Sequence, residues 1–152
     1  MTSEIQNIAT NRKARHEFHL FDTFEAGLEL AGSEVKSLRE GRANLKDAYI
    51  TIRNGSAFLV GAHISPYSHT GFSGHDPDRD RQLLLNKREI RKIKQKTAEK
   101  GFTVVPLKLY FKKGWAKVEI AVAKGKHTYD KREARKSRDI ARDTAREMRK
   151  YS

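Results

Sequence analysis

Turn chemistry in the middle of the chain constrains its fold more than any other feature. Residues 48–53 and 56–64 are two runs rich in strand-forming residues, and they flank Asn54 and Gly55. Because Asn and Gly tolerate the positive φ angles of a type I′ turn, this segment predicts an antiparallel hairpin.

A second hairpin is predicted from residues 104–111 and 116–122, which are joined across Lys-Lys-Gly-Trp at 112–115. Pro106 lies inside the first run, and proline cannot donate a hydrogen bond to a strand ladder. It therefore predicts an edge position or a bulge. Residues 16–20 alternate apolar and polar side chains and predict a further strand, with residues 24–30 as its candidate continuation.

Two helices are predicted between the strands. The shorter one covers residues 33–40, with Ser33 as N-cap, Val35 and Leu38 facing inward, and Gly41 just after its end. The polar segment 65–82 predicts a loop that is either functional or disordered.

The longer predicted helix covers residues 83–100 and ends at Gly101. Leu83, Ile90 and Ile93 fall within one stripe of this helix, and its other positions are strongly basic. Leu84 lies about 100° from that stripe, so it is either a second core contact or an exposed apolar contact.

About six strands with glycine-marked turns and inserted helices favour a small antiparallel barrel, because an open sheet would leave an unprotected edge. The predicted fold is mainly β with packed helices. Its parts are a flexible N-terminus at 1–11, a barrel domain at 12–125 and a basic C-terminal tail at 126–152.

The charge is lopsided, with 32 Lys and Arg against 19 Asp and Glu, a net of +13. Such a chain is drawn to an anionic partner, nucleic acid first and an anionic membrane second. A helix that lies on a membrane needs bulky apolar residues opposite its charges. The tail has only Ile140 and Met148 there, so a membrane partner is disfavoured. The chain has no cysteine, no apolar run of transmembrane length and no signal-peptide pattern, so we expect a cytoplasmic protein without a membrane partner.

The tail predicts a helix with a basic stripe and almost nothing to bury. Its cations follow at steps of four and three, which places them on one side of a helix. They are Lys131, Arg135, Arg138, Arg142, Arg146 and Arg149. The stripe is either a solvated face or a surface for a polyphosphate partner, and a tail without an apolar face needs that partner to fold.

Eight segments carry a more specific signal. They are Asn-Arg-Lys-Ala-Arg-His-Glu at 11–17, Phe-Glu-Ala-Gly-Leu at 24–28, Gly-Ser-Glu-Val-Lys-Ser-Leu-Arg at 32–39, Gly-Ala-His-Ile-Ser-Pro-Tyr at 61–67, Leu-Leu-Leu-Asn-Lys-Arg-Glu-Ile at 83–90, Val-Pro-Leu at 105–107, Ala-Lys-Gly-Lys at 123–126 and Asp-Lys-Arg at 130–132. Together they resemble the small protein B family (SmpB, the SsrA-binding proteins) over nearly the whole chain.

The resemblance implies an OB-type barrel that binds the tRNA-like domain of transfer-messenger RNA. It also implies a part in trans-translation, the rescue of stalled ribosomes. The partners implied are this RNA, the decoding centre and message channel of the small ribosomal subunit with its 16S rRNA, and elongation factor Tu in the delivered complex. We expect a monomeric adaptor that is not an enzyme and that holds no cofactor and no metal.

The resemblance also implies two groups of contact residues. Those for transfer-messenger RNA are Lys13, Glu34, Lys36, Arg39, Leu84, Asn86, Lys87, Arg88 and Lys124. Those for the decoding centre and message channel are Asp130, Lys131 and Arg132, followed by Arg135, Arg138, Arg142, Arg146 and Arg149.

Several of these residues also fit ordinary structural roles. Glu34 could be a capping residue, or it could accept hydrogen bonds from RNA or orient nearby cations. Asn86 could be a plain residue at a helix start, and the acid–base order at 130–132 could be helix-start chemistry. Trp115, like Tyr67 and Phe72, is more typical of a packing residue or a loop anchor than of a base-stacking platform.

One position departs from the family pattern. Many members have histidine immediately before Asp-Lys-Arg, where this chain has Tyr129. A tyrosine can still stack on a base, but any mechanism that needs an imidazole there is in doubt.

Two other classes of protein are rivals to the adaptor. A structural ribosomal protein, or a general RNA-binding OB-fold protein, would also combine a barrel with a basic tail. A nuclease would need a cluster of carboxylates, and the acidic residues here are scattered.

Overall fold

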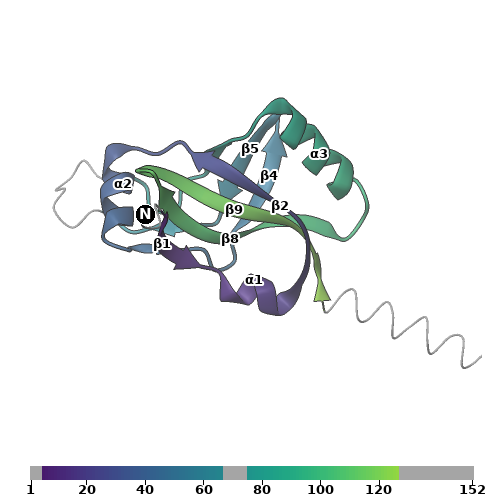
Figure 1. The fold of residues 1–152 in the computed structure, drawn as a ribbon, viewed down its shortest axis with the longest axis horizontal. Helices are drawn as coiled ribbons and strands as arrows, with labels where there is room; N and C mark the ends of the chain where they lie inside the picture. Colours follow the sequence, from purple (N-terminus) through teal and green to yellow (C-terminus); the bar gives the residue numbers. More distant parts are fainter. Residues whose placement is uncertain (1–4, 67–74, 127–152) are drawn as a thin grey trace, which may run out of the picture.

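The computed structural model describes residues 5–66 and 75–126 (Figure 1). Within them the chain is mainly β, as the sequence predicts, and it has three helices, one more than the two predicted between the strands. The strands are β1 (Ile5–Thr10), β2 (Phe18–Leu28), β3 (Ala43–Asn44), β4 (Tyr49–Arg53), β5 (Ser56–Val60), β6 (His63–Ile64), β7 (Arg81–Leu84), β8 (Phe102–Lys112) and β9 (Trp115–Gly125). The helices are α1 (Arg12–Glu17), α2 (Gly32–Arg39) and α3 (Lys87–Thr97).

Antiparallel pairing organises the strands into one large sheet with the order β1-β8-β4-β5-β7-β2-β9. Strand β9 also pairs with β8, so the pairings of six strands return on themselves. β1 adds to β8 from outside this ring, while β3 and β6 form a separate short pair.

Pro106 marks the point where β8 changes neighbours. Before it, Val104 pairs with β4, and after it, β8 pairs with β1 from Lys108 onward. The register against β9 also shifts between Pro106 and Lys108, so the predicted bulge is confirmed. A residue without an N–H suits a site where one partner strand ends and the next begins.

Both predicted hairpins are confirmed, each with a two-residue turn. Asn54 and Gly55 have φ of 50° and 79°, and Lys113 and Gly114 have φ of 51° and 82°. Positive φ at both central residues is the requirement of a type I′ turn.

The main core lies inside the ring, where the inward side chains of the strands meet α3. Leu59, Leu83, Ile120 and Ile93 of α3 are at most 2 % exposed. Each such side chain contributes about 1.5–3 kcal/mol by burial. A smaller apolar cluster forms under α1, where Ala14 packs with alternate residues of β8 and β9.

The N-terminal segment differs from the prediction of a flexible stretch up to residue 11. Residues 5–10 form β1, and Ile8 and Ala9 pack against the main core. Asn11 then caps α1, accepting a hydrogen bond from the Ala14 N–H at 3.2 Å. Its Nδ2 donates to Pro106 O at 2.9 Å. The predicted strand at 16–20 therefore begins only at Phe18, because α1 uses the residues before it.

The two predicted helices are present with changed bounds. α2 begins one residue before Ser33 with Ala31 as its N-cap, and Gly41 follows its end with φ of 72°. The helix predicted at 83–100 is shorter, because residues 81–84 form β7 and Asn86 starts α3. In the part of the chain that the structure describes, no helix is long and apolar enough to cross a bilayer.

Candidate nucleic-acid interface

Helix α3 presents a row of cations on its outer side. Ile90 and Ile93 face the core, and most other residues of the helix are exposed. The exposed cations are Lys87, Arg88, Arg91, Lys92 and Lys94. This side of the helix therefore offers several positive charges to an anionic partner.

Leu84 is an exposed apolar residue directly before this helix. It is the last residue of β7, and its side chain is 56 % exposed. The structure thus supports the exposed alternative for Leu84, although in a strand and not on the predicted helix. Leu84 and Lys87 line a shallow cavity of about 420 Å³, together with Gln82 and Gly55.

Gly27 of β2 determines how Leu84 lies. The two residues are directly paired across β2 and β7. A Cβ on Gly27 would stand 3.3 Å from the Leu84 Cβ and 3.4 Å from its Cδ1. Because glycine has no side chain, Leu84 can lie flat over β2 and still expose more than half of its surface.

Asn86 forms a capping box with Glu89. Its Oδ1 accepts from the Glu89 N–H at 2.8 Å, and the Glu89 carboxylate accepts from the Asn86 N–H at 3.2 Å. The side-chain oxygen is therefore engaged in starting α3. A contact between Asn86 and RNA would chiefly use the Nδ2 amide group.

Glu34 of α2 lies in a closed cluster of charges. Its side chain and that of Arg81 are both 0 % exposed, and Arg81 Nε donates to Glu34 Oε2 at 2.7 Å. Arg79 donates from Nε to both carboxylate oxygens at 3.1 Å, and the Ala31 N–H donates to Oε1 at 2.8 Å. Burial alone would raise the pKa of Glu34, but the hydrogen bonds from Arg79, Ala31 and Arg81 together hold it below its usual value.

This cluster fastens residues 75–81 to the body. Arg81 donates to the carbonyl oxygens of Ala62 at 2.7 Å and Pro77 at 2.9 Å. His75 lies 2.8 Å from both Ser33 Oγ and the Ile64 carbonyl oxygen. The Glu34 carboxylate has no exposed surface with which to touch RNA. The geometry fits both the capping role, through Ala31, and the alternative in which Glu34 orients cations.

Arg79 and Arg81 are not among the residues predicted for the site. They lie at the end of the segment predicted to be a loop, in the run Asp-Arg-Asp-Arg at 78–81. The two arginines alternate with Asp just before the apolar run 83–85. This alternation is the one local feature that indicates a strand with an arginine on its buried side. The partner, Glu34, lies more than 40 residues earlier in the chain.

Lys36 and Arg39 lie on the exposed side of α2, one turn apart. Their cationic groups belong to the same helix as Glu34 and can meet phosphates without disturbing the cluster behind them.

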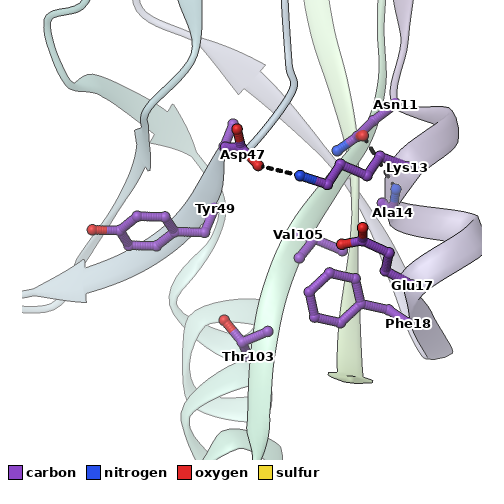
Figure 2. Close-up of a pocket in the computed structure, with 10 residues that line it drawn as sticks. Asn11, Lys13, Ala14, Glu17, Phe18, Asp47, Tyr49, Thr103 and Val105 are labelled. Atoms are coloured by element: carbon purple, nitrogen blue, oxygen red, sulfur yellow. Dashed lines mark hydrogen bonds and ion pairs between the residues drawn. The ribbon is translucent and has the colours of Figure 1, made fainter. Parts of the chain in front are cut away.

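Lys13 and Lys124 are built into other parts of the surface. Lys13 Nζ lies 2.6 Å from Asp47 Oδ1, and this hydrogen bond raises the pKa of Lys13. Figure 2 shows Lys13 reaching from α1 to Asp47 at a cavity of about 330 Å³, with Glu17 and Phe18 on the same side of the helix. Lys124 Nζ lies over the Phe102 ring, 4.8 Å from its centroid. The structure therefore does not bring these two lysines into the cavity lined by Leu84 and Lys87.

The predicted ribosome contacts all lie outside the described residues. They are Asp130, Lys131, Arg132, Arg135, Arg138, Arg142, Arg146 and Arg149, and Tyr129 lies there too. Across residues 5–66 and 75–126 no group of three or more His, Cys, Asp or Glu side chains could hold a metal ion.

Trp115 departs from its predicted role in packing. It is the first residue of β9 and its side chain is 73 % exposed. Tyr67 and Phe72, for which the same role is predicted, lie outside the described residues.

Comparisons with known proteins point to one family. The family model described as SmpB protein matches residues 8–150. The SsrA-binding protein of Nitratidesulfovibrio vulgaris strain DP4 is 54 % identical over 144 residues, covering 95 % of this chain and 94 % of the relative. That of Trichodesmium erythraeum strain IMS101 is 52 % identical over 145 residues, covering 95 % and 93 %.

A solved structure shares the fold as well. A chain of the structure described as "tmRNA-SmpB: a journey to the center of the bacterial ribosome" superposes with a TM-score of 0.67 and 41 % identity. The match covers 79 % of this chain and 85 % of that one. Since the family model spans almost the whole sequence and relatives exceed half identity along it, this chain belongs to the SmpB family.

Proposed function

We propose that this chain is an adaptor that binds the tRNA-like domain of transfer-messenger RNA and directs it to stalled ribosomes for trans-translation. The observation that carries the proposal is the identity of more than half to SsrA-binding proteins over 95 % of the chain. The adaptor role needs no chemistry of its own, so we propose no enzymatic activity.

The finer fold assignment belongs to this proposal. We infer that the ring of six strands is an OB-type barrel, because the pairing of β9 with both β2 and β8 closes it. Such barrels bind oligonucleotides on one face and through the loops between strands.

The proposed RNA surface combines α2, the end of β7 and the start of α3. Lys36, Arg39, Lys87 and Arg88 contact phosphates, which gives affinity that depends on salt. Leu84 offers an apolar contact to an unstacked nucleobase, and Asn86 offers its Nδ2 group. The exposure of Leu84 at 56 % beside a basic helix supports this division of roles.

Glu34 contributes to the same surface indirectly. It holds Arg79 and Arg81, and through them residues 75–81, against α2. We assign it a positioning role. Lys13 and Lys124 are assigned phosphate contacts on a separate part of the surface, where Lys13 is already paired with Asp47.

The tail is assigned to the ribosome. Asp130, Lys131 and Arg132 would make the first contacts with the decoding centre, and the arginine series from Arg135 to Arg149 would follow the empty message channel. The proposal includes delivery with elongation factor Tu, action as a monomer and location in the cytoplasm.

A truncation tests the division between body and tail. A chain that stops after Gly125 keeps all of β9. We expect it to bind transfer-messenger RNA with affinity close to that of the full chain, and to lose tagging of stalled products. Affinity is measured by filter binding, and tagging in a reconstituted translation reaction.

Two outcomes would contradict the proposal. A collapse of RNA affinity in the truncated chain would refute the separation of roles. Retention of the full chain on ribosomes in stoichiometric amount after a high-salt wash would favour a structural ribosomal protein instead.

A further inference from the structure

Trp115 is the single tryptophan of the chain, and its side chain lies on the surface of the molecule. At 73 % exposure, it presents most of its indole ring to solvent. The rigid turn at Lys113 and Gly114 and the pairing of Trp115 with Lys112 fix its backbone at the end of the β8–β9 hairpin. A single exposed apolar side chain is ordinary, so what matters is whether Trp115 forms a patch with another one, such as Leu84.

Strand register places Trp115 on the same face of the sheet as Leu84. Lys117 of β9 pairs with Gly27 of β2, and Gly27 pairs with Leu84 of β7. Residues directly opposite each other share a face, and so do residues two apart in one strand. Trp115 and Leu84 are therefore on one face, with Lys117 and Gly27 between them.

The two exposed side chains are also close enough to act together. Two strand spacings and two residues along β9 separate them, which puts their Cα atoms about 12 Å apart. Since Gly27 adds no side chain to the intervening strand, nothing from that position rises between them. The hairpin lies at the same end of the long axis as α2 in Figure 1, which carries Lys36 and Arg39.

The residues next to Trp115 in the sequence are basic. Residues 112–117 contain three lysines and no acidic residue. Glu25, an acid on the same face, is already engaged: Tyr110 Oη donates to it at 2.5 Å, and Lys112 Nζ lies 3.4 Å away. Lysine is depleted in the cores of protein–protein interfaces, whereas aromatic rings among cations are typical of surfaces for unpaired nucleic acid.

We propose that Trp115 is a stacking platform for an unpaired nucleobase of the bound RNA, with Lys117 contacting an adjacent phosphate. The contact extends the surface around Leu84 across Gly27 to the tip of the β8–β9 hairpin. It deepens the proposed function and rests on it, because the RNA that supplies the base is the one bound by the body.

The single tryptophan makes the test direct. Emission from Trp115 of the full chain is followed while transfer-messenger RNA is added, and binding is measured in parallel by filter retention. We expect emission to be quenched along the same curve as binding. Trp115→Ala should bind roughly tenfold more weakly, and Trp115→Phe should lose less, because a phenyl ring still stacks.

Salt dependence separates the two roles. Trp115→Ala should leave the dependence of affinity on salt unchanged, while Lys117→Gln should reduce its slope, because only the second change removes a phosphate contact. Tyr49→Ala is the matched control. Tyr49 is 44 % exposed on β4 and lines the separate cavity beside Lys13, so its loss should leave the quenching of Trp115 emission by bound RNA intact.

The outcomes are distinct. If the chain binds the RNA but emission does not change and Trp115→Ala binds normally, the inference is overturned while the proposed function stands. An emission change that occurs only with ribosomal protein, and not with RNA, overturns it equally. If the unaltered chain does not bind the RNA at all, the proposed function fails together with it.

Discussion

Glu34 illustrates how a single buried carboxylate can organise a surface that it does not reach. It lies against Arg81, whose side chain is also fully buried, and against the partly exposed Arg79. Removing one partner of a buried pair leaves the other charge without compensation, which is more damaging than the loss of an exposed pair. Glu34 therefore matters first to the stability of residues 75–81 and only then to RNA.

We expect Glu34→Gln to lower the free energy of unfolding by about 3 kcal/mol, because Arg81 would stay buried beside a neutral amide. Urea denaturation measures this loss. Lys36→Gln, an exposed change on the same helix, should shift the free energy by less than about 0.5 kcal/mol and is the control. Equal effects of the two changes would contradict the role assigned to the cluster.

Glu34 also makes the free energy of unfolding depend on pH. The folded-state pKa of Glu34 lies below its ordinary value of 4.5, so its contribution is complete above that value. The contribution is lost as the pH falls through the depressed pKa. Unfolding free energies measured between neutral pH and acid should therefore decline less steeply for Glu34→Gln than for the unaltered chain.

At the scale of elements, Asn86 has two candidate roles that a pair of substitutions can separate. Asn86→Ala removes the cap of α3 and should lower stability by about 1 kcal/mol. Asn86→Asp keeps a good cap, but replaces the Nδ2 donor with a negative charge.

We therefore expect Asn86→Asp to retain the melting temperature of the unaltered chain and to bind transfer-messenger RNA more weakly. Thermal denaturation and filter binding measure the two quantities. If Asn86→Asp binds RNA normally, Asn86 serves only to start the helix. A large fall in melting temperature for Asn86→Ala would also mark it as chiefly structural.

Elements set by local chemistry could be predicted, and those set by distant contacts could not. Asn54-Gly55 and the turn at Lys113 and Gly114 encode their hairpins within a few residues. By contrast, α1 has only six residues and depends on Asn11, whose side chain reaches Pro106, 95 positions later. The apolar run at 83–85 fits a strand or a helix equally well. It begins in a strand because β7 pairs with β2 on one side and β5 on the other.

In the candidate site, too, local features could be predicted and features that depend on distant contacts could not. The exposed cations of α2 and α3 could be predicted, because charge and helical spacing are visible in the sequence. The burial of Glu34 could not, because it results from Arg79 and Arg81 folding back onto α2. The exposure of Trp115 was equally hidden, since an apolar residue next to a turn usually packs.

For the whole molecule, the net charge of +13 predicts that binding to RNA weakens with salt. Replacing Lys87 and Arg88 together by Gln should reduce the slope of log affinity against log salt by about 1.5, as expected for two lost phosphate contacts. Lys96→Gln, on the same helix but paired with Asp22, is the control and should leave the slope unchanged. An unchanged slope in the double variant would show that these two cations do not contact phosphates.

The last strand also fixes where the tail begins. Near its end, β9 is paired on both sides: Gly125 lies opposite Phe18 of β2, and Lys124 lies opposite Phe102 of β8. These pairings give Gly125 a defined position in the body. Residues inserted just after Gly125 would shift every later residue relative to the body and leave the body unchanged. The number of residues at this junction therefore sets the distance between the RNA-bound body and whatever the tail engages.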